Sequence, residues 1–270
     1  MDTEPTAPSR PWLALAGIAL VVACLVAPLS VLARRYLFVE SIQFCAFALA
    51  APALVALGAP WRRLTLGAPW RLAPRGAARA VSRLAEARWR RTSFVATLSY
   101  LIAWVVLCLL WRLPPVLDEL ARHPLLVLPE AVTLGAAGLG LWLELAPAPA
   151  AAPAAAAAAA PAAAPAAVPA AAPRRLRPER ALIAALAMWS VWAIAYVLGF
   201  AHDSVVHAYD QAGSHLGTVA DQEISAFLLW AAAGAAFAPV VFTVLLTWLR
   251  DGSEPAGKPA GSGVRGWGTR

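Results

Sequence analysis

The chain has 270 residues, of which 61% are hydrophobic and only 14% are charged, and its formal net charge is +7. A soluble globular protein has roughly 45–50% apolar and about 25% charged residues. The composition therefore excludes an ordinary soluble enzyme and a disordered chain, and it favours a membrane protein with several spans. The 22 Lys and Arg residues lie between long apolar runs, which indicates a role in membrane topology rather than nucleic-acid binding.

Six apolar stretches have the length of about 20 residues that a membrane-spanning helix needs. They are 12–33, 38–59, 93–111, 124–145, 181–201 and 224–249. None of them alternates between apolar and polar residues, so strands are a poor interpretation. The predicted fold class is all-α, a polytopic membrane bundle of six transmembrane helices.

Four of these spans contain a proline, at Pro28, Pro52, Pro129 and Pro239. Neighbouring helices can satisfy the carbonyl groups that a proline leaves free in a membrane, so kinked helices are expected. Small residues recur in 135–140 and 231–236, and they predict close approach between helices.

The predicted organisation has five parts. Between the two membrane halves lies a stretch of 20 Ala, seven Pro and one Val, which predicts a low-complexity linker. The parts are a cytoplasmic segment 1–11, a first membrane half 12–145 with a basic loop 60–92, the linker 146–173, a second membrane half 174–250, and a disordered cytoplasmic tail 251–270.

The distribution of Lys and Arg predicts the orientation of the bundle. With six spans, both termini and the loops after the second and fourth spans share one side, and this side holds 18 cations. The opposite side holds Arg34, Arg35, Arg112 and Arg122. Because cytoplasmic loops carry the excess of Lys and Arg, the prediction is that both termini are cytoplasmic.

The outer loop 202–223 contains no Lys or Arg and holds three of the four histidines. If the fifth helix continued outward by two turns, Asp203, His207 and Asp210 would share one face. Together with His202 these side chains form a candidate zinc or copper site. The alternative is an acidic periplasmic loop without a metal.

Ionisable residues near the outer ends of the spans are further candidates. Glu40, Arg112 and Glu130 are predicted to lie on the same side, so Arg112 either pairs with one of the two carboxylates or faces the headgroups. Cys45 and Cys108 also fall in the outer half, where they are either Cu(I) ligands or apolar filling. No nucleophile elbow, phosphate loop, HExxH or dinucleotide fingerprint is present, so no enzymatic activity is expected.

The ordered set of motifs resembles the CtaG-type cytochrome c oxidase assembly factors of bacteria. The second span reads Ser41-Ile42-Gln43 and then 51–60, APALVALGAP; the third ends in 110–114, LWRLP, followed by Asp118 and 123–126, HPLL; and the sixth opens with 221–224, DQEI. The resemblance covers the first span to about Arg250, apart from the Ala/Pro linker. The polar positions that are similar to the family are Gln43, Asp118, Glu130, Asp221 and Gln222.

The resemblance implies a multi-pass protein of the bacterial inner membrane that assists maturation of a haem–copper oxidase, with copper delivery as the role usually inferred. It implies oxidase subunits or other assembly factors as partners, within the lipid bilayer and without nucleic acid. The chain departs from the family at the positions of its typical histidines. These positions hold Glu40, Phe44, Arg112, Val127 and Ala131.

Two interpretations follow from these departures, and a third is disfavoured. The protein is either a divergent assembly factor that holds copper weakly or not at all, or a membrane scaffold without metal that binds oxidase subunits or other assembly proteins. A small-solute transporter is disfavoured because the chain shows no inverted repeat and few polar groups near the membrane midplane.

Overall fold

In the computed structural model, the described residues are 10–58, 94–146, 178–210 and 216–253. Within these ranges the structure is helical and contains no strand. The predicted loop 60–92, most of the linker 146–173 and the tail beyond Ser253 lie outside them. Five helical segments are long and apolar enough to cross a membrane: Leu37–Gly58, Phe94–Trp111, Pro124–Leu145, Glu179–Phe200 and Thr218–Arg250.

The first predicted span, 12–33, is not one helix. It consists of α1 (Pro11–Leu25) and the short α2 (Leu29–Leu32), with Val26 in an extended conformation between them. Pro28 has no N–H to donate to a preceding turn, so the helix ends before it instead of kinking. Helix α1 has 15 residues and is shorter than the other five segments, so the structure supports five spans and leaves the sixth as a prediction.

The second span is the central element of the bundle. It comprises α3 (Leu37–Cys45), the π-helical turn η1 (Ala46–Ala50) and α4 (Ala51–Gly58). Pro52 frees the carbonyl of Ala48, and the indole N–H of Trp104 donates a hydrogen bond to that carbonyl at 3.2 Å. The expected satisfaction of a freed carbonyl by a neighbouring helix is therefore confirmed here.

Small residues bring two neighbouring helices against this central span, as predicted. A Cβ added at Gly138 would lie 2.6 Å from the Ala48 carbonyl oxygen, and one at Gly58 would lie 2.6 Å from the Ala14 backbone nitrogen. Gly138 belongs to α9 (Val127–Leu145), which follows the 3₁₀ turn η2 (Pro124–Leu126), and Ala14 belongs to α1. Pro129 lies in the first turn of α9, where its missing N–H costs no helical hydrogen bond, so no kink forms there.

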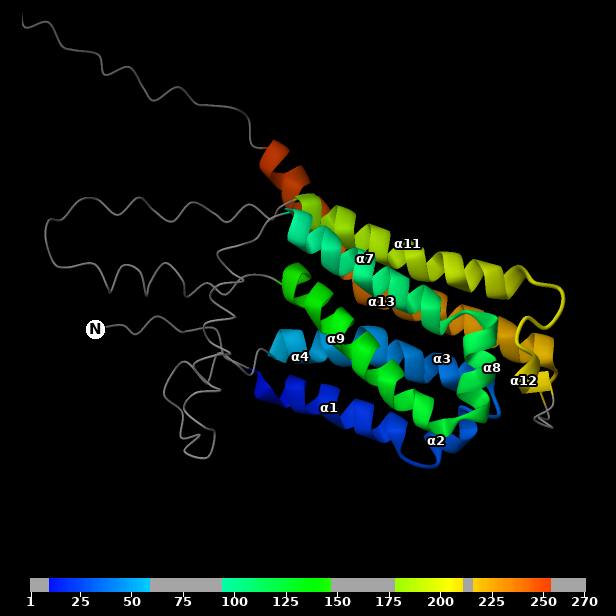
Figure 1. The fold of residues 1–270 in the computed structure, drawn as a ribbon. Helices are drawn as coiled ribbons and strands as arrows, with labels where there is room; N and C mark the ends of the chain where they lie inside the picture. The colour runs from blue at the N-terminus through cyan, green and yellow to red at the C-terminus, as the bar shows by residue number, and fades with distance from the viewer. Residues whose placement is uncertain (1–9, 59–93, 147–177, 211–215, 254–270) are drawn as a thin grey trace, which may run out of the picture.

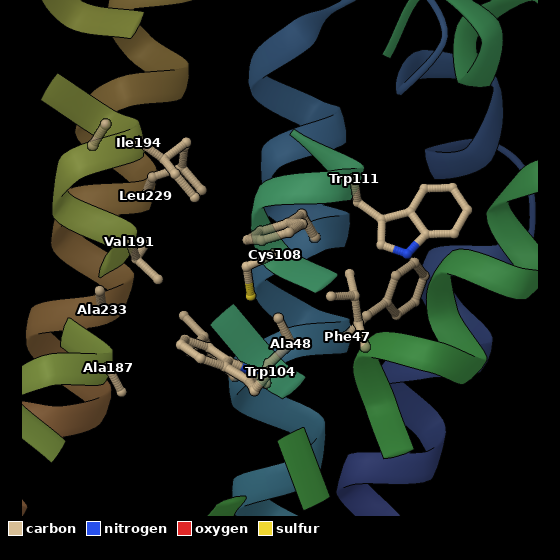
Figure 2. Close-up of a cluster of buried hydrophobic side chains, with 14 of the residues drawn as sticks. Phe47, Ala48, Trp104, Cys108, Trp111, Ala187, Val191, Ile194, Leu229 and Ala233 are labelled. Atoms are coloured by element: carbon tan, nitrogen blue, oxygen red, sulfur yellow. The ribbon is translucent and has the colours of Figure 1, made fainter. Parts of the chain in front are cut away.

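The remaining spans are α7 (Phe94–Trp111), α11 (Pro178–Phe200) and α13 (Thr218–Ser253), with Pro239 inside the last. Helix α11 packs lengthwise against α13, and α13 also packs on α3 of the central span. Helix α7 contacts α11 on one side and α9 on the other (Figure 1). In Figure 2, Ala187 and Val191 of α11 lie opposite Cys108 and Trp104 of α7, so apolar side chains fill this layer. Helices α8 (Pro114–Arg122) and α12 (His207–Asp210) contact each other at one end of the bundle.

Candidate functional site

A buried ion pair joins the second and third spans. The Nη1 atom of Arg112 donates a hydrogen bond to Oε2 of Glu40 at 2.6 Å, and the two side chains are 1% and 2% exposed. The guanidinium carbon also lies 4.1 Å from the centroid of the Phe44 ring. Of the two alternatives from the sequence, pairing with a carboxylate is therefore confirmed, and the carboxylate is that of Glu40.

The same cluster includes two serines that link it to the last span. Arg112 Nη1 donates a second hydrogen bond to the hydroxyl of Ser41 at 3.1 Å, and the hydroxyls of Ser41 and Ser225 hydrogen-bond each other. We call these five residues, Glu40, Ser41, Phe44, Arg112 and Ser225, the arginine cluster. Sequence reasoning missed Ser225, although it shares a helical face with Asp221 and Gln222 at spacings of four and three residues.

Glu130 lies near this cluster without joining it. Its side chain is fully buried in α9, and within the described residues neither carboxylate oxygen has a hydrogen-bond partner. Oε1 of Glu40 and the Nε and Nη2 atoms of Arg112 are likewise without partners there. A cavity of about 140 Å³ is lined by Glu40, Gln43 and Tyr209, which is room for a few ordered water molecules beside Glu40.

The other family-like polar residues hold backbone groups at helix ends. Asp221 accepts hydrogen bonds from the backbone N–H groups of Leu37 and Phe38, both at 2.8 Å, at the start of α3. The side-chain NH₂ of Gln43 donates to the Cys24 carbonyl near the end of α1. These are groups that a helix leaves unpaired at its ends, so the two side chains fix how α1 and α3 meet the bundle.

Asp118 and Gln222 hold the segment that connects α11 to α13. Asp118 accepts a hydrogen bond from the Ala208 N–H at 2.7 Å, in α12. The side-chain NH₂ of Gln222 donates to the Leu198 carbonyl at 2.8 Å, and its carbonyl oxygen accepts from the Val205 N–H at 3.0 Å. In the structure, both side chains therefore hold backbone groups of this connection in place.

Tyr209 was not singled out by the sequence. Its hydroxyl donates to the carbonyl of Ala33 at 3.2 Å, so it ties α12 to the turn after α2. Burial raises the pKa of Tyr209 well above its usual range, and the carboxylate of Glu40 adds to this effect. The hydroxyl therefore stays protonated and remains a donor at physiological pH. A single tyrosine in a polar loop gives no sequence signal for this role.

The candidate metal residues of the outer loop do not share a helical face. Helix α11 ends at Phe200, where Gln222 satisfies a C-terminal carbonyl, and a separate helix begins at His207. The condition for the shared face, that the fifth helix continues outward by two turns, is therefore not met. His202 and Asp203 are exposed, as is His207, while the side chain of Asp210 lies outside the described residues. No three His, Cys, Asp or Glu side chains gather as metal ligands in the part of the chain that the structure describes.

The positions of the family's typical histidines do not fit a metal ion in this chain. A guanidinium offers no lone pair and repels a cation, and Arg112 lies between Glu40 and the Phe44 ring. Val127 and Ala131 carry only hydrocarbon side chains. Cys45 is half-buried and Cys108 is fully buried, both among the apolar side chains of the core.

The comparisons with known proteins give one match. A family model described as cytochrome c oxidase caa3 assembly factor (Caa3_CtaG) matches residues 2–172, which is more than half of the chain and includes Glu40, Arg112 and Glu130. No curated protein and no solved structure matches. The chain belongs to the cytochrome c oxidase caa3 assembly factor family.

Proposed function

We propose that this protein assists the maturation of a bacterial haem–copper cytochrome c oxidase as a non-catalytic membrane scaffold, without a metal site inside the bilayer. Membership in the assembly factor family supports the process. The arginine cluster supports the metal-free mechanism, because a buried guanidinium paired with Glu40 stands at one of the family's typical ligand positions. The partners would be oxidase subunits or other assembly factors in the inner membrane.

The proposed topology has six spans with both termini in the cytoplasm. Helix α1 would be the sixth span, because it runs beside α4 and starts at the level of the bundle where α4 ends (Figure 1). Its 15 residues extend over about 22 Å, which is short for a hydrocarbon core of roughly 30 Å. Local thinning of the bilayer is a known response to such a mismatch.

Copper, if the protein handles it at all, would be cargo held by the outer loop. His202 and His207 are exposed there, and an exposed site has few surrounding groups to orient its ligands, so its affinity should be modest. We expect purified protein to retain substoichiometric copper after dialysis. That remainder should disappear when His202→Ala and His207→Ala are combined. A stable one-to-one complex that survives both changes would contradict the metal-free mechanism.

Deletion of the gene tests the process itself. Cells without the protein should assemble less active oxidase, measured as oxidase activity and haem content in isolated membranes. The wild-type gene and the His202→Ala, His207→Ala double variant should restore it equally, because partner binding would not need those ligands. Normal oxidase levels in the deletion strain would overturn the proposed function, and rescue by the wild-type gene alone would point to metal handling by the loop.

A further inference from the structure

The small cavity beside Glu40 joins the inside of the bundle to its surface. Glu40 and Gln43 of α3 line it together with Tyr209 of α12, and all three side chains are buried. The exposed residues Arg34 and Pro124 line it as well. Arg34 follows α2 and Pro124 follows α8, so the cavity reaches the surface at the end of the bundle where these short helices lie (Figure 1).

Glu40 borders this cavity with a carboxylate that the protein satisfies only in part. Its Oε2 atom accepts a hydrogen bond from Arg112, whereas Oε1 has no partner among the described residues. The hydroxyl groups of Ser30 and Tyr209 also belong to the lining. The Tyr209 hydroxyl donates its proton to the Ala33 carbonyl, so its oxygen remains able to accept. A buried water molecule makes about two to four hydrogen bonds, and these groups provide partners for them.

The charges around the cavity select a neutral, polar ligand. A cation would meet the guanidinium of Arg34 near the surface and, further in, a carboxylate that Arg112 already neutralises. An anion would be repelled by Glu40. A hydrocarbon chain would leave Oε1 buried without a hydrogen bond, which is unfavourable for a carboxylate. Water meets these conditions, and a volume of about 140 Å³ is enough for a few water molecules.

We propose that this cavity is a hydrated site, in which a small cluster of water molecules donates a hydrogen bond to Glu40 Oε1 and exchanges with the aqueous phase past Arg34. These water molecules supply the donor that the protein does not, and they stabilise the buried ion pair. The inference goes beyond the proposed function. It depends neither on oxidase maturation nor on the number of spans.

The test is radiolytic labelling of the purified full-length protein in detergent. Hydroxyl radicals that X-rays form from bound water oxidise the side chains that the water contacts, and mass spectrometry locates the added oxygen. Tyr209 and Trp104 are matched reporters, because both are aromatic and they are only 4% and 0% exposed. Tyr209 lines the cavity, and Trp104 is not part of its described lining. We expect Tyr209 to be oxidised during exposures that leave Trp104 unmodified.

Two variants in α9 show whether the cavity is the source of the radicals. Val127 lines the cavity, so Val127→Phe should fill it and abolish oxidation of Tyr209. Val132→Phe adds the same ring at a position that is 68% exposed, and its labelling should equal that of the wild type. An unmodified Tyr209 in the wild type would overturn the proposal, as would oxidation that persists in Val127→Phe or is lost in Val132→Phe.

A chemical probe decides the question if Val127→Phe does not fold. Val127→Cys should react with hydroxyethyl methanethiosulfonate, a small neutral reagent that dissolves in water. Leu134→Cys should not react, because Leu134 lies two turns further along α9 and is fully buried. The stretch 123–173 contains no native cysteine, so a label there reports the introduced thiol alone. No reaction at Val127→Cys, or equal reaction at both positions, would rule out a hydrated site in this cavity.

Discussion

The contribution of the Arg112–Glu40 pair to the free energy of unfolding depends more on the burial of the two charges than on the short distance between Nη1 and Oε2. Removing two charges from water costs several kcal/mol per ion, so a buried pair adds little stability by itself. Removal of one partner is different, because it leaves the other charge buried without compensation. Phe44 and Ser41 contact the guanidinium, and Ser225 holds the Ser41 hydroxyl, so these contacts limit how far the guanidinium can move toward water.

We therefore expect Arg112→Met or Glu40→Gln alone to destabilise the protein by about 3–5 kcal/mol. The double variant should cost less than the sum, with a coupling energy of about 0.5–3 kcal/mol. The measurement is unfolding in mild detergent, monitored by tryptophan fluorescence, for the wild type, the two single variants and the double variant. A parallel cycle of Arg112→Met with Glu130→Gln should show weaker coupling, because no hydrogen bond joins those two side chains. Additive effects of Arg112→Met and Glu40→Gln would mean that the pair does not form.

Asp221 gives a second prediction at this scale. Its carboxylate accepts both N–H groups at the start of α3, so Asp221→Ala should cost about 0.5–2 kcal/mol, the range for residues that cap helices. Asp221→Asn keeps an acceptor oxygen and should lose less. Glu223→Ala is the matched control, since Glu223 is an exposed acid two residues away. Thermal unfolding in detergent compares the three variants, and equal losses for Asp221→Ala and Glu223→Ala would rule out a capping role.

At the scale of single elements, the apolar runs predicted most helices within a few residues. The spans 93–111 and 124–145 agree with Phe94–Trp111 and Pro124–Leu145, because long apolar runs in a membrane have few alternatives to a helix. The end of α11 at Phe200 also agrees with the predicted span 181–201, whereas the break before Pro28 was not predictable in this way. The hydrogen bond from Gln222 to the Leu198 carbonyl at that end joins residues 24 positions apart, and the apolar run gives no signal for it.

The same limit applies to the candidate site. The sequence identified Glu40 and Arg112 as ionisable residues near the outer ends of their spans. The predicted topology places both on the same side of the membrane, so a contact between them was one of the expected alternatives. The sequence could not show whether Glu40 or Glu130 is the partner of Arg112, because both carboxylates are predicted at the same end of the bundle. The packed structure decides this: it places Glu40 Oε2 at 2.6 Å from Arg112 and leaves both carboxylate oxygens of Glu130 without a hydrogen-bond partner among the described residues.

Close packing of α9 on the central span gives a prediction for that pair of elements. A methyl group at Gly138 would meet the backbone oxygen of Ala48 and the Pro52 ring, neither of which can rotate away. Gly138→Ala should therefore cost about 1–3 kcal/mol, as overpacking usually does. Gly135→Ala, in the same helix with no atom near the added methyl, should be neutral or more stable by up to about 1 kcal/mol. Equal effects in detergent unfolding would show that α9 is not in close contact there.

At the scale of the whole molecule, the two ends of the bundle differ in the residues that they carry. The arginine cluster, Asp118 and Gln222 lie toward the end with α8 and α12, where the short helices close the bundle (Figure 1). The opposite end carries the ends of α4 and α9 and the start of α11 (Figure 1). The polar side chains of the arginine cluster, Asp118 and Gln222 contact other groups of the bundle itself. The proposed assembly partner would therefore meet exposed loop residues such as His202 and Asp203 at the end with α8 and α12.

The orientation of these two ends in the membrane gives the last prediction. In the proposed six-span topology, the side with both termini carries 18 of the 22 cations, and cytoplasmic loops retain such an excess because positive charges cross the membrane poorly. His215→Cys, in the outer loop, should react with an impermeant thiol reagent added to intact cells, and Arg83→Cys, in the basic loop, should react only after the cells are opened. The native cysteines provide a low background, since Cys24 and Cys108 are buried and Cys45 is half-buried. The number of spans is tested at the same time, because a cytoplasmic N-terminus requires α1 to cross the bilayer despite its 15 residues. A cysteine introduced at Thr3 should therefore be protected in intact cells. Its labelling from outside would leave five spans and place α1 in the outer leaflet.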